Sequence, residues 1–351
     1  MTSAGRPHVR RRIRLAVGGA VVLTALTVAT ADASVPSQTG VRGPEMARPA
    51  GGTGTGTRPR TQAPGFLLDR GRATGFDAPG ARMQTGPLGI DDRRRIVGNY
   101  VDAAGAYHGF LRDGRGRFTT IDVPGALATQ PETSNNRGQI VGSYSTTAAQ
   151  LQAPNGKPRG FLLERGRFTR IDVPGAVQTQ AKGINERAQV VGEYLDAAGK
   201  FHGFLWDKGR FTTIDVPGAG ATSLADINDL GEILGGYSDP DDAATLHGVL
   251  LRRGRYHRFD APGGPITFAL DVNDRGQIVA VSFDGASLTS VRSFLLAKGV
   301  DGPFTPVAFP GAPLTLAAAL NDRGQLVGSY QNPDVTPNPP TTDAPPMHRM
   351  S

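Results

Sequence analysis

Three carboxylates in one short segment could bind a metal ion. Asp239, Asp241 and Asp242 are close together in the sequence, and carboxylate oxygens are the ligands that Ca²⁺ prefers. The segment lacks the ligand spacing of a known calcium-binding loop. It therefore predicts either a weak calcium site or a solvated acidic loop, and we expect no other cofactor.

Three histidines recur at equivalent places in the chain. His108, His202 and His247 each precede a glycine that opens an apolar run, and imidazole is a common metal ligand. Equivalent residues of a repeat lie in separate structural units, which places them too far apart to share one ion. We therefore expect each histidine to hydrogen-bond to a nearby loop.

Five aspartates stand before Pro-Gly turns: Asp77, Asp122, Asp172, Asp215 and Asp260. Two carboxylates about 5 to 10 Å apart can hydrolyse a glycosidic bond. Repetition instead favours a structural role, in which each carboxylate accepts hydrogen bonds from the amides of its own turn.

A threonine follows each of six Pro-Gly turns, and five of the six have the same spacing from the proline. They are Thr85, Thr129, Thr179, Thr222, Thr267 and Thr315. Each lies just before a predicted strand. Their hydroxyls either bond from one repeat to the next or form a polar ring that contacts a ligand.

Familiar catalytic motifs are absent from the sequence. We find no Gly-x-Ser-x-Gly, no His-Glu-x-x-His, no phosphate-binding glycine loop and no zinc spacing. There is also no cysteine, which excludes disulfides, thiolate metal sites and a cysteine nucleophile. Catalytic activity is thus less expected than binding, for which fold analogy is the only support.

These candidate binding residues lie within a sequence pattern of 43 to 51 residues that recurs six times. Each copy opens with Gly-Phe-Leu or a near relative, at Gly65, Gly109, Gly160, Gly203, Gly248 and Ser293. Self-similarity at such a period indicates a repeat architecture.

The third copy, 160–202, shows what one unit contains. Residues 161–163 and 168–171 form a predicted hairpin around Glu164-Arg165-Gly166, and a second hairpin turns at Asn185. Copies four to six have Asn-Asp-x-Gly at this inner turn, whereas copies one and three place Arg94 and Ala188 where glycine is expected. Each of these should cost about 1 kcal/mol if the backbone is unchanged.

Four strands per copy predict an all-β fold, a six-bladed β-propeller. The region opens with a lone outer hairpin, 65–77, and closes with a lone inner hairpin, 316–330. Pairing these two would complete a sixth sheet and close the ring without exposed edges. In this ring the six threonines would surround the mouth of the central channel. An open β-solenoid is the alternative.

The recurring His-Gly-Phe-Leu, at 108–111 and 202–205, with Gly-Ile-Asn and Ile-Val-Gly-x-Tyr between, resembles the HAF-repeat family of probable extracellular proteins. The resemblance covers residues 65–330 and implies secretion and a repeat fold. It supplies no catalytic residues. Pro64, Arg159 and Arg292 replace the histidine of the motif in three copies.

The ends of the chain differ in composition from the repeats. Arg10, Arg11, Arg12 and Arg14 precede an apolar run, 15–28, which predicts a signal peptide over 1–33. Residues 34–62 are a predicted disordered leader rich in Gly, Thr and Pro, 63–330 the propeller, and 331–351 a disordered Pro-rich tail. We therefore expect a secreted, extracellular protein without a membrane span.

The formal charge of +7 falls to +3 without residues 1–33, which hold five Arg and one Asp. Arginines recur singly in the hairpin turns, so nucleic acid is not an expected partner. In the predicted propeller the tight turns lie at one face and the longer loops at the opposite, long-looped face. The sequence predicts a monomeric binding module whose long-looped face binds an extracellular glycan or protein. The alternatives are a polysaccharide lyase or hydrolase acting over the central channel, or a purely structural envelope protein.

Overall fold

The computed structural model describes residues 61–148, 151, 156–242, 244–284 and 290–334. The predicted signal peptide, nearly all of the leader and most of the tail lie outside these residues. The described part contains 24 β-strands and one short 3-10 helix, η2 (Gly299–Asp301). The prediction of an all-β protein is confirmed.

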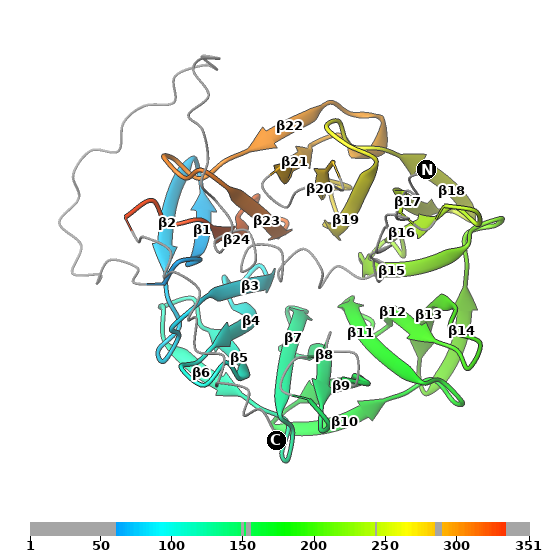
Figure 1. Ribbon diagram of the computed structural model, residues 1–351, viewed down its shortest axis with the longest axis horizontal. Coiled ribbons are helices and arrows are strands. Elements are labelled where there is room, and N and C mark those ends of the chain that lie inside the picture. The colour runs from blue at the N-terminus through cyan, green and yellow to red at the C-terminus, as the bar shows by residue number, and fades with distance from the viewer. Residues whose placement is uncertain (1–60, 149–150, 152–155, 243, 285–289, 335–351) are drawn as a thin grey trace, which may run out of the picture.

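The strands surround a central axis in four sets (Figure 1). The innermost set is β3 (Thr85–Ile90), β7 (Ala128–Ser134), β11 (Gln178–Ile184), β15 (Ala221–Ile227), β19 (Ile266–Val272) and β23 (Thr315–Leu320). The second set is β4 (Ile96–Val101), β8 (Ile140–Ser145), β12 (Val190–Leu195), β16 (Ile233–Ser238), β20 (Ile278–Phe283) and β24 (Leu326–Tyr330). The third set is β1 (Gly65–Asp69), β5 (Tyr107–Arg112), β9 (Arg159–Glu164), β13 (Phe201–Asp207), β17 (Leu246–Arg252) and β21 (Arg292–Leu296). The outermost set is β2 (Arg72–Phe76), β6 (Phe118–Ile121), β10 (Arg167–Ile171), β14 (Arg210–Ile214), β18 (Arg255–Phe259) and β22 (Phe304–Val307).

Antiparallel groups of four strands are the unit of the fold. One four-stranded sheet has the order β11-β12-β13-β14, and two eight-stranded sheets each join two such groups through a single parallel pair. Another four-stranded sheet combines the two ends of the repeat region in the order β2-β1-β24-β23. Within it, β1 pairs antiparallel with β24 from Gly65↔Ser329 to Leu68↔Leu326.

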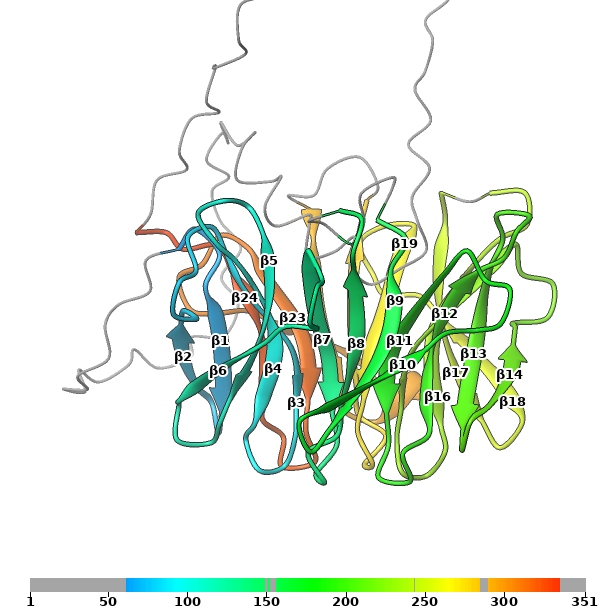
Figure 2. The ribbon, with the colours of Figure 1, turned by 90° about the horizontal axis from the view of Figure 1, so that it is seen from below.

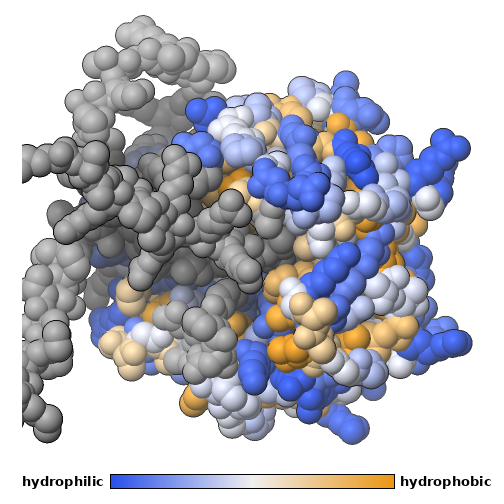
Figure 3. Space-filling model, turned by 45° about the vertical axis from the view of Figure 1, so that its right-hand side comes forward, coloured by the Kyte–Doolittle hydropathy of each residue, from blue (hydrophilic) through white to orange (hydrophobic). Residues whose placement is uncertain are grey.

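Apolar side chains fill the spaces between neighbouring sheets. The phenylalanines of the Gly-Phe-Leu motifs are among the most buried residues, with Phe66, Phe110, Phe161 and Phe204 at most 1% exposed. One cluster packs Leu67 and Val327 against Ile96, so the core is continuous between the last strands and the first. Outside this core the surface is mixed, and hydrophilic side chains project between smaller hydrophobic areas (Figure 3).

Each innermost strand has a β-bulge at the same place. The register shifts after Pro87, Pro131, Ala181, Leu224, Ala269 and Ala317. An extra residue at this point interrupts the alternation of faces along the strand. The bulged residues are Leu88, Glu132, Lys182, Ala225, Leu270 and Ala318.

The strands run alternately up and down, which separates two kinds of connection. The tight hairpin turns lie at one face and the longer loops at the opposite face (Figure 2). Two inner turns keep a left-handed backbone without glycine: φ is 61° at Arg94 and 60° at Ala188, against 76° at Gly231 in another copy.

Replacing Ala188 by glycine should stabilise the protein. Glycine adopts positive φ without the steric cost that a Cβ imposes, so Ala188→Gly should raise the free energy of unfolding by up to about 1 kcal/mol in urea titrations. Ala198→Gly, in an exposed loop, is the control and should give no gain. Equal effects of the two substitutions would contradict the interpretation.

A second prediction concerns glycines that allow the bulge. A Cβ on Gly192 would lie 1.9 Å from the carbonyl oxygen of Gln180 on the paired strand, whereas a Cβ on Gly236 would meet only the His247 oxygen at 3.2 Å. Gly192→Ala should therefore cost about 1–3 kcal/mol of unfolding free energy, the range of overpacked cores. Gly236→Ala should cost less, and urea titration of both variants decides the matter.

Candidate functional site

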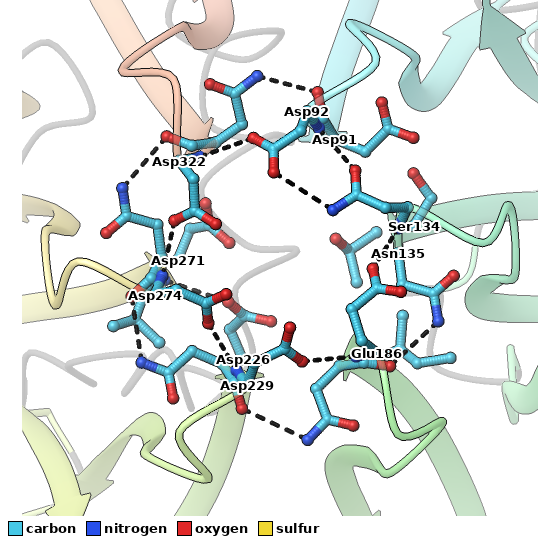
Figure 4. Close-up of a pocket in the computed structure, with 18 of the residues that line it drawn as sticks. Asp91, Asp92, Ser134, Asn135, Glu186, Asp226, Asp229, Asp271, Asp274 and Asp322 are labelled. Atoms are coloured by element: carbon cyan, nitrogen blue, oxygen red, sulfur yellow. Dashed lines mark hydrogen bonds between the residues drawn. The ribbon is translucent and has the colours of Figure 1, made fainter.

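The six inner turns are joined into a circuit of hydrogen bonds around the axis (Figure 4). In five of them the asparagine Nδ2 donates to the backbone oxygen of the next turn: Asn135 to Asn185, Asn185 to Asn228, Asn228 to Asn273, Asn273 to Asn321, and Asn321 to Asp91. The first copy has Asp91 in place of asparagine, and there Arg95 Nη2 donates to the Asn135 oxygen at 3.1 Å. The circuit is therefore complete.

The next residue of each turn forms a second circuit. Its backbone N–H donates a hydrogen bond to the side chain of the equivalent residue in the next turn, and the Asp322 N–H donates to the Asp92 carboxylate at 3.0 Å, which closes this circuit. The six residues are Asp92, Asn136, Glu186, Asp229, Asp274 and Asp322. Five carboxylates and one carboxamide thus converge at one mouth of the axis. Burial, together with the charges of Asp229 and Asp322, raises the pKa of Asp274 to about 6 although the Asp229 N–H opposes the shift.

These side chains line a cavity of about 90 Å³, and two more carboxylates lie on its wall. Asp226 accepts a hydrogen bond from the Val272 N–H at 3.1 Å, and Asp271 accepts one from the Leu320 N–H at 2.6 Å. Burial raises the pKa of both carboxyls, and for Asp271 the charge of Asp226 adds to it. The two carboxyls also hydrogen-bond to each other, which contributes to the raised pKa of Asp271.

The bulged positions of β7 and β11 carry charged groups. Lys182 Nζ lies 3.1 Å from Glu193 Oε1 and donates to Ser223 Oγ at 3.2 Å. Glu132 accepts a hydrogen bond from Gln130 Nε2 at 2.6 Å. Burial raises the pKa of Glu132 to about 7, opposed by Gln130 and by the Lys182 charge.

Buried polar atoms next to this group have no hydrogen-bond partner among the described residues. They are Asn99 Oδ1, Ser143 Oγ and Glu193 Oε2, from β4, β8 and β12, on side chains at most 1% exposed. Asn99 Nδ2 also donates to Gln130 Oε1 at 2.9 Å. An unsatisfied buried polar atom costs about 1–3 kcal/mol, so three of them on the second strands of consecutive groups indicate missing contacts. We call Asn99, Gln130, Glu132, Ser143, Lys182, Glu193 and Ser223 the wall cluster.

The six threonines predicted to line the channel mouth are buried. Each hydroxyl oxygen accepts a backbone N–H of the preceding Pro-Gly loop, as in Thr129 from Val123 at 3.0 Å and Thr179 from Val173 at 3.1 Å. Thr85, Thr222, Thr267 and Thr315 make the same contact. None of the six lines the described cavity. They fix the loops, and ligand binding by them stays a prediction.

The predicted calcium segment lies in a long loop. Asp242 accepts hydrogen bonds from the Ala244 N–H at 3.0 Å and the Thr245 hydroxyl at 2.7 Å, while Asp239 lies 3.4 Å from His247 Nε2. Asp241 is exposed. Within the described ranges, no group of three or more His, Asp or Glu side chains is placed to hold a metal ion.

Each of the three repeated histidines lies between two aspartates. Nδ1 of His108 lies 2.9 Å from Asp122, Nδ1 of His202 lies 2.7 Å from Asp215, and Nδ1 of His247 lies 2.8 Å from Asp260. Their Nε2 atoms face Asp102, Asp196 and Asp239. Burial opposes the charged form, but the aspartates outweigh it and raise the pKa of His108 and His247. The predicted hydrogen-bonding role of these histidines is confirmed.

No helix in the described residues is long and apolar enough to span a membrane. No family model and no curated protein matches the sequence.

Solved structures do match the fold. A putative TolB from Agrobacterium tumefaciens is 12% identical with a TM-score of 0.52, and the match covers 78% of this chain and 100% of that one. AofleA from Arthrobotrys oligospora is 12% identical with a TM-score of 0.45, covering 74% of this chain and 79% of that one. An Aleuria aurantia lectin variant in complex with Fucα1-6GlcNAc is 12% identical with a TM-score of 0.43, covering 73% and 98%. Together with the radial sheets, the likeness to this TolB structure assigns the fold to the β-propellers. At 12% identity this likeness shows the fold alone.

The Asp226–Asp271 pair should make stability depend on pH. A carboxyl whose pKa is raised in the folded state stabilises the fold at acidic pH, and this contribution is lost as the pH rises through the raised pKa. Asp271→Asn removes one of the two carboxyls whose pKa is raised, so the unfolding free energy of this variant relative to wild type should increase as the pH rises above the ordinary carboxyl pKa of about 4. Urea titrations at a series of pH values test it. A difference that does not change with pH would contradict the assignment.

Proposed function

We propose that the protein is a closed six-bladed β-propeller that acts as an extracellular binding module. The sheet β2-β1-β24-β23 would be the blade that closes the ring. Two contacts across this junction support closure, from Asn321 Nδ2 to the Asp91 oxygen and from the Asp322 N–H to Asp92. Export is supported by the N-terminal segment and by the resemblance to HAF-repeat proteins.

The ligand, in this proposal, binds at the wall cluster, whose residues lie on inner strands and are separate from the lining of the described cavity. The observation that carries it is a break in the repeat. Glu132 and Lys182 occupy the bulged position of two neighbouring blades, where the other four have Leu88, Ala225, Leu270 and Ala318. A side chain needed to build every blade would recur in every blade. A charged pair in two blades, next to unpartnered polar atoms, instead fits recognition.

The strands on the two sides of the axis differ in polarity, which suits a glycan as the ligand. β7, with Glu132, lies across the axis from β19, with Phe268 and Leu270 (Figure 1). Phe268 belongs to an apolar cluster with Leu316, and Leu270 packs against it. A sugar ring has polar hydroxyl edges and an apolar face, so a strand with charged and amide groups opposite a strand with apolar residues suits it.

Glycoside hydrolysis is the second candidate, because Glu132 has the pKa of about 7 that a general acid–base needs near neutral pH. Reducing ends released from a bound polysaccharide would identify this activity. Binding without release would support the binding module.

A pH series of glycan binding tests the site. Ionised Glu132 would accept hydrogen bonds from ligand hydroxyls, so affinity for a glycan found by array screening should rise as the pH passes about 7. Glu132→Gln should lower the affinity about tenfold at pH 8, the worth of a charge-assisted hydrogen bond, and abolish the pH dependence.

Glu164→Gln, at an exposed outer turn, is the control and should bind as wild type does. Unchanged binding by the Glu132 variant at every pH would reject the wall cluster as the site. Failure of the full chain to bind any glycan class would reject the proposal that the ligand is a glycan.

A further inference from the structure

The face of the protein formed by the tight turns is covered with basic side chains. Exposed Lys and Arg occur in every hairpin turn except the fourth inner turn, where Leu230 is 67% exposed. At the inner turns they are Arg93, Arg94, Arg137, Arg187, Arg275 and Arg323. At the outer turns they are Arg70, Arg72, Arg115, Arg117, Arg165, Arg167, Lys208, Arg210, Arg253, Arg255 and Lys298.

Acidic side chains do not balance this charge at the surface. In the same turns only Glu164 and Asp301 are exposed. The other carboxylates of these turns are buried or half-buried, as in the Asp92–Asp322 circuit, and some of them pair with an arginine that stays in solvent. Arg117 pairs with Asp113 and Arg137 with Glu186, yet their side chains are 74% and 63% exposed.

The fold explains why charges that are scattered in the sequence meet in space. Strands alternate in direction, so every tight turn returns to the same face and the turns end near one level (Figure 2). The basic residues of turns some 20 residues apart in the chain therefore form two concentric rings. The sequence pattern alone predicts no charged patch, but the fold gathers these residues into a broad electropositive face.

We propose that this face docks on a planar anionic surface, namely the acidic headgroups of a lipid bilayer. Turns that end near one level let their arginines approach a plane together, whereas a linear polymer would reach one arc of the rings at a time. Each basic residue near such a surface gains attraction that falls off within a Debye length. This inference does not depend on the proposed glycan site.

Vesicle sedimentation with the full chain tests the proposal. We expect binding to vesicles of phosphatidylcholine with roughly one-third phosphatidylglycerol at roughly 0.05 M salt, and its loss at roughly 0.5 M. The variant Arg72→Gln/Arg167→Gln/Arg210→Gln should bind these vesicles at least tenfold more weakly. The control Arg82→Gln/Lys200→Gln/Arg292→Gln removes the same charge from the long-looped face and should bind as wild type does.

The apolar N-terminal segment is present in every variant, so its contribution to binding cancels in these comparisons. Equal affinity for pure phosphatidylcholine vesicles, or equal losses in the two triple variants, would overturn the proposal. Binding to soluble heparin without binding to the vesicles would also overturn it, in favour of a linear polyanion. Circular dichroism of each variant confirms that the fold is retained.

Discussion

The hydrogen bonds that pass from each inner turn to the next are the constraint on which the structure depends. A four-stranded group cannot bury both of its faces alone, and its apolar side chains must pack against a neighbour. The asparagine and carboxylate contacts fix how far one group is rotated relative to the next. They also bring Asp92, Glu186, Asp229, Asp274 and Asp322 to one mouth of the axis. The same bonds therefore hold the sheets in place and create the acidic cavity.

Much of the fold could be predicted from local signals. The Gly-Phe-Leu period marks the third strand of each group, and Asn-Asp-x-Gly marks the inner turn, since asparagine bonds its own backbone and glycine adopts positive φ. Even the exceptions follow, because Arg94 and Ala188 keep the left-handed φ of the turn. Each of these signals acts within a few residues, which is why the sequence alone contains them.

The axial residues could not be predicted in the same way. Glu132 and Lys182 lie in strands whose alternation a bulge interrupts, so their direction does not follow from the pattern. Asp226 and Asp271 appear in the sequence as ordinary polar strand residues, and only packing brings them together. The break in repeat symmetry was the available signal. The repeated threonines, which attract attention because they recur, instead hold the Pro-Gly loops.

The sheet that contains both β1 and β24 has a consequence for biosynthesis. Gly65 of β1 pairs with Ser329 of β24, so this sheet joins residues about 260 positions apart in the chain. Such distant contacts form slowly, and domains emerge from the ribosome with their N-terminal part first. β1 must wait with an unpaired edge until the last strands have been translated, and during that interval the edge is open to pairing with another chain. Completion of this sheet thus waits for β24, and the nascent chain is most vulnerable to aggregation until that strand is available.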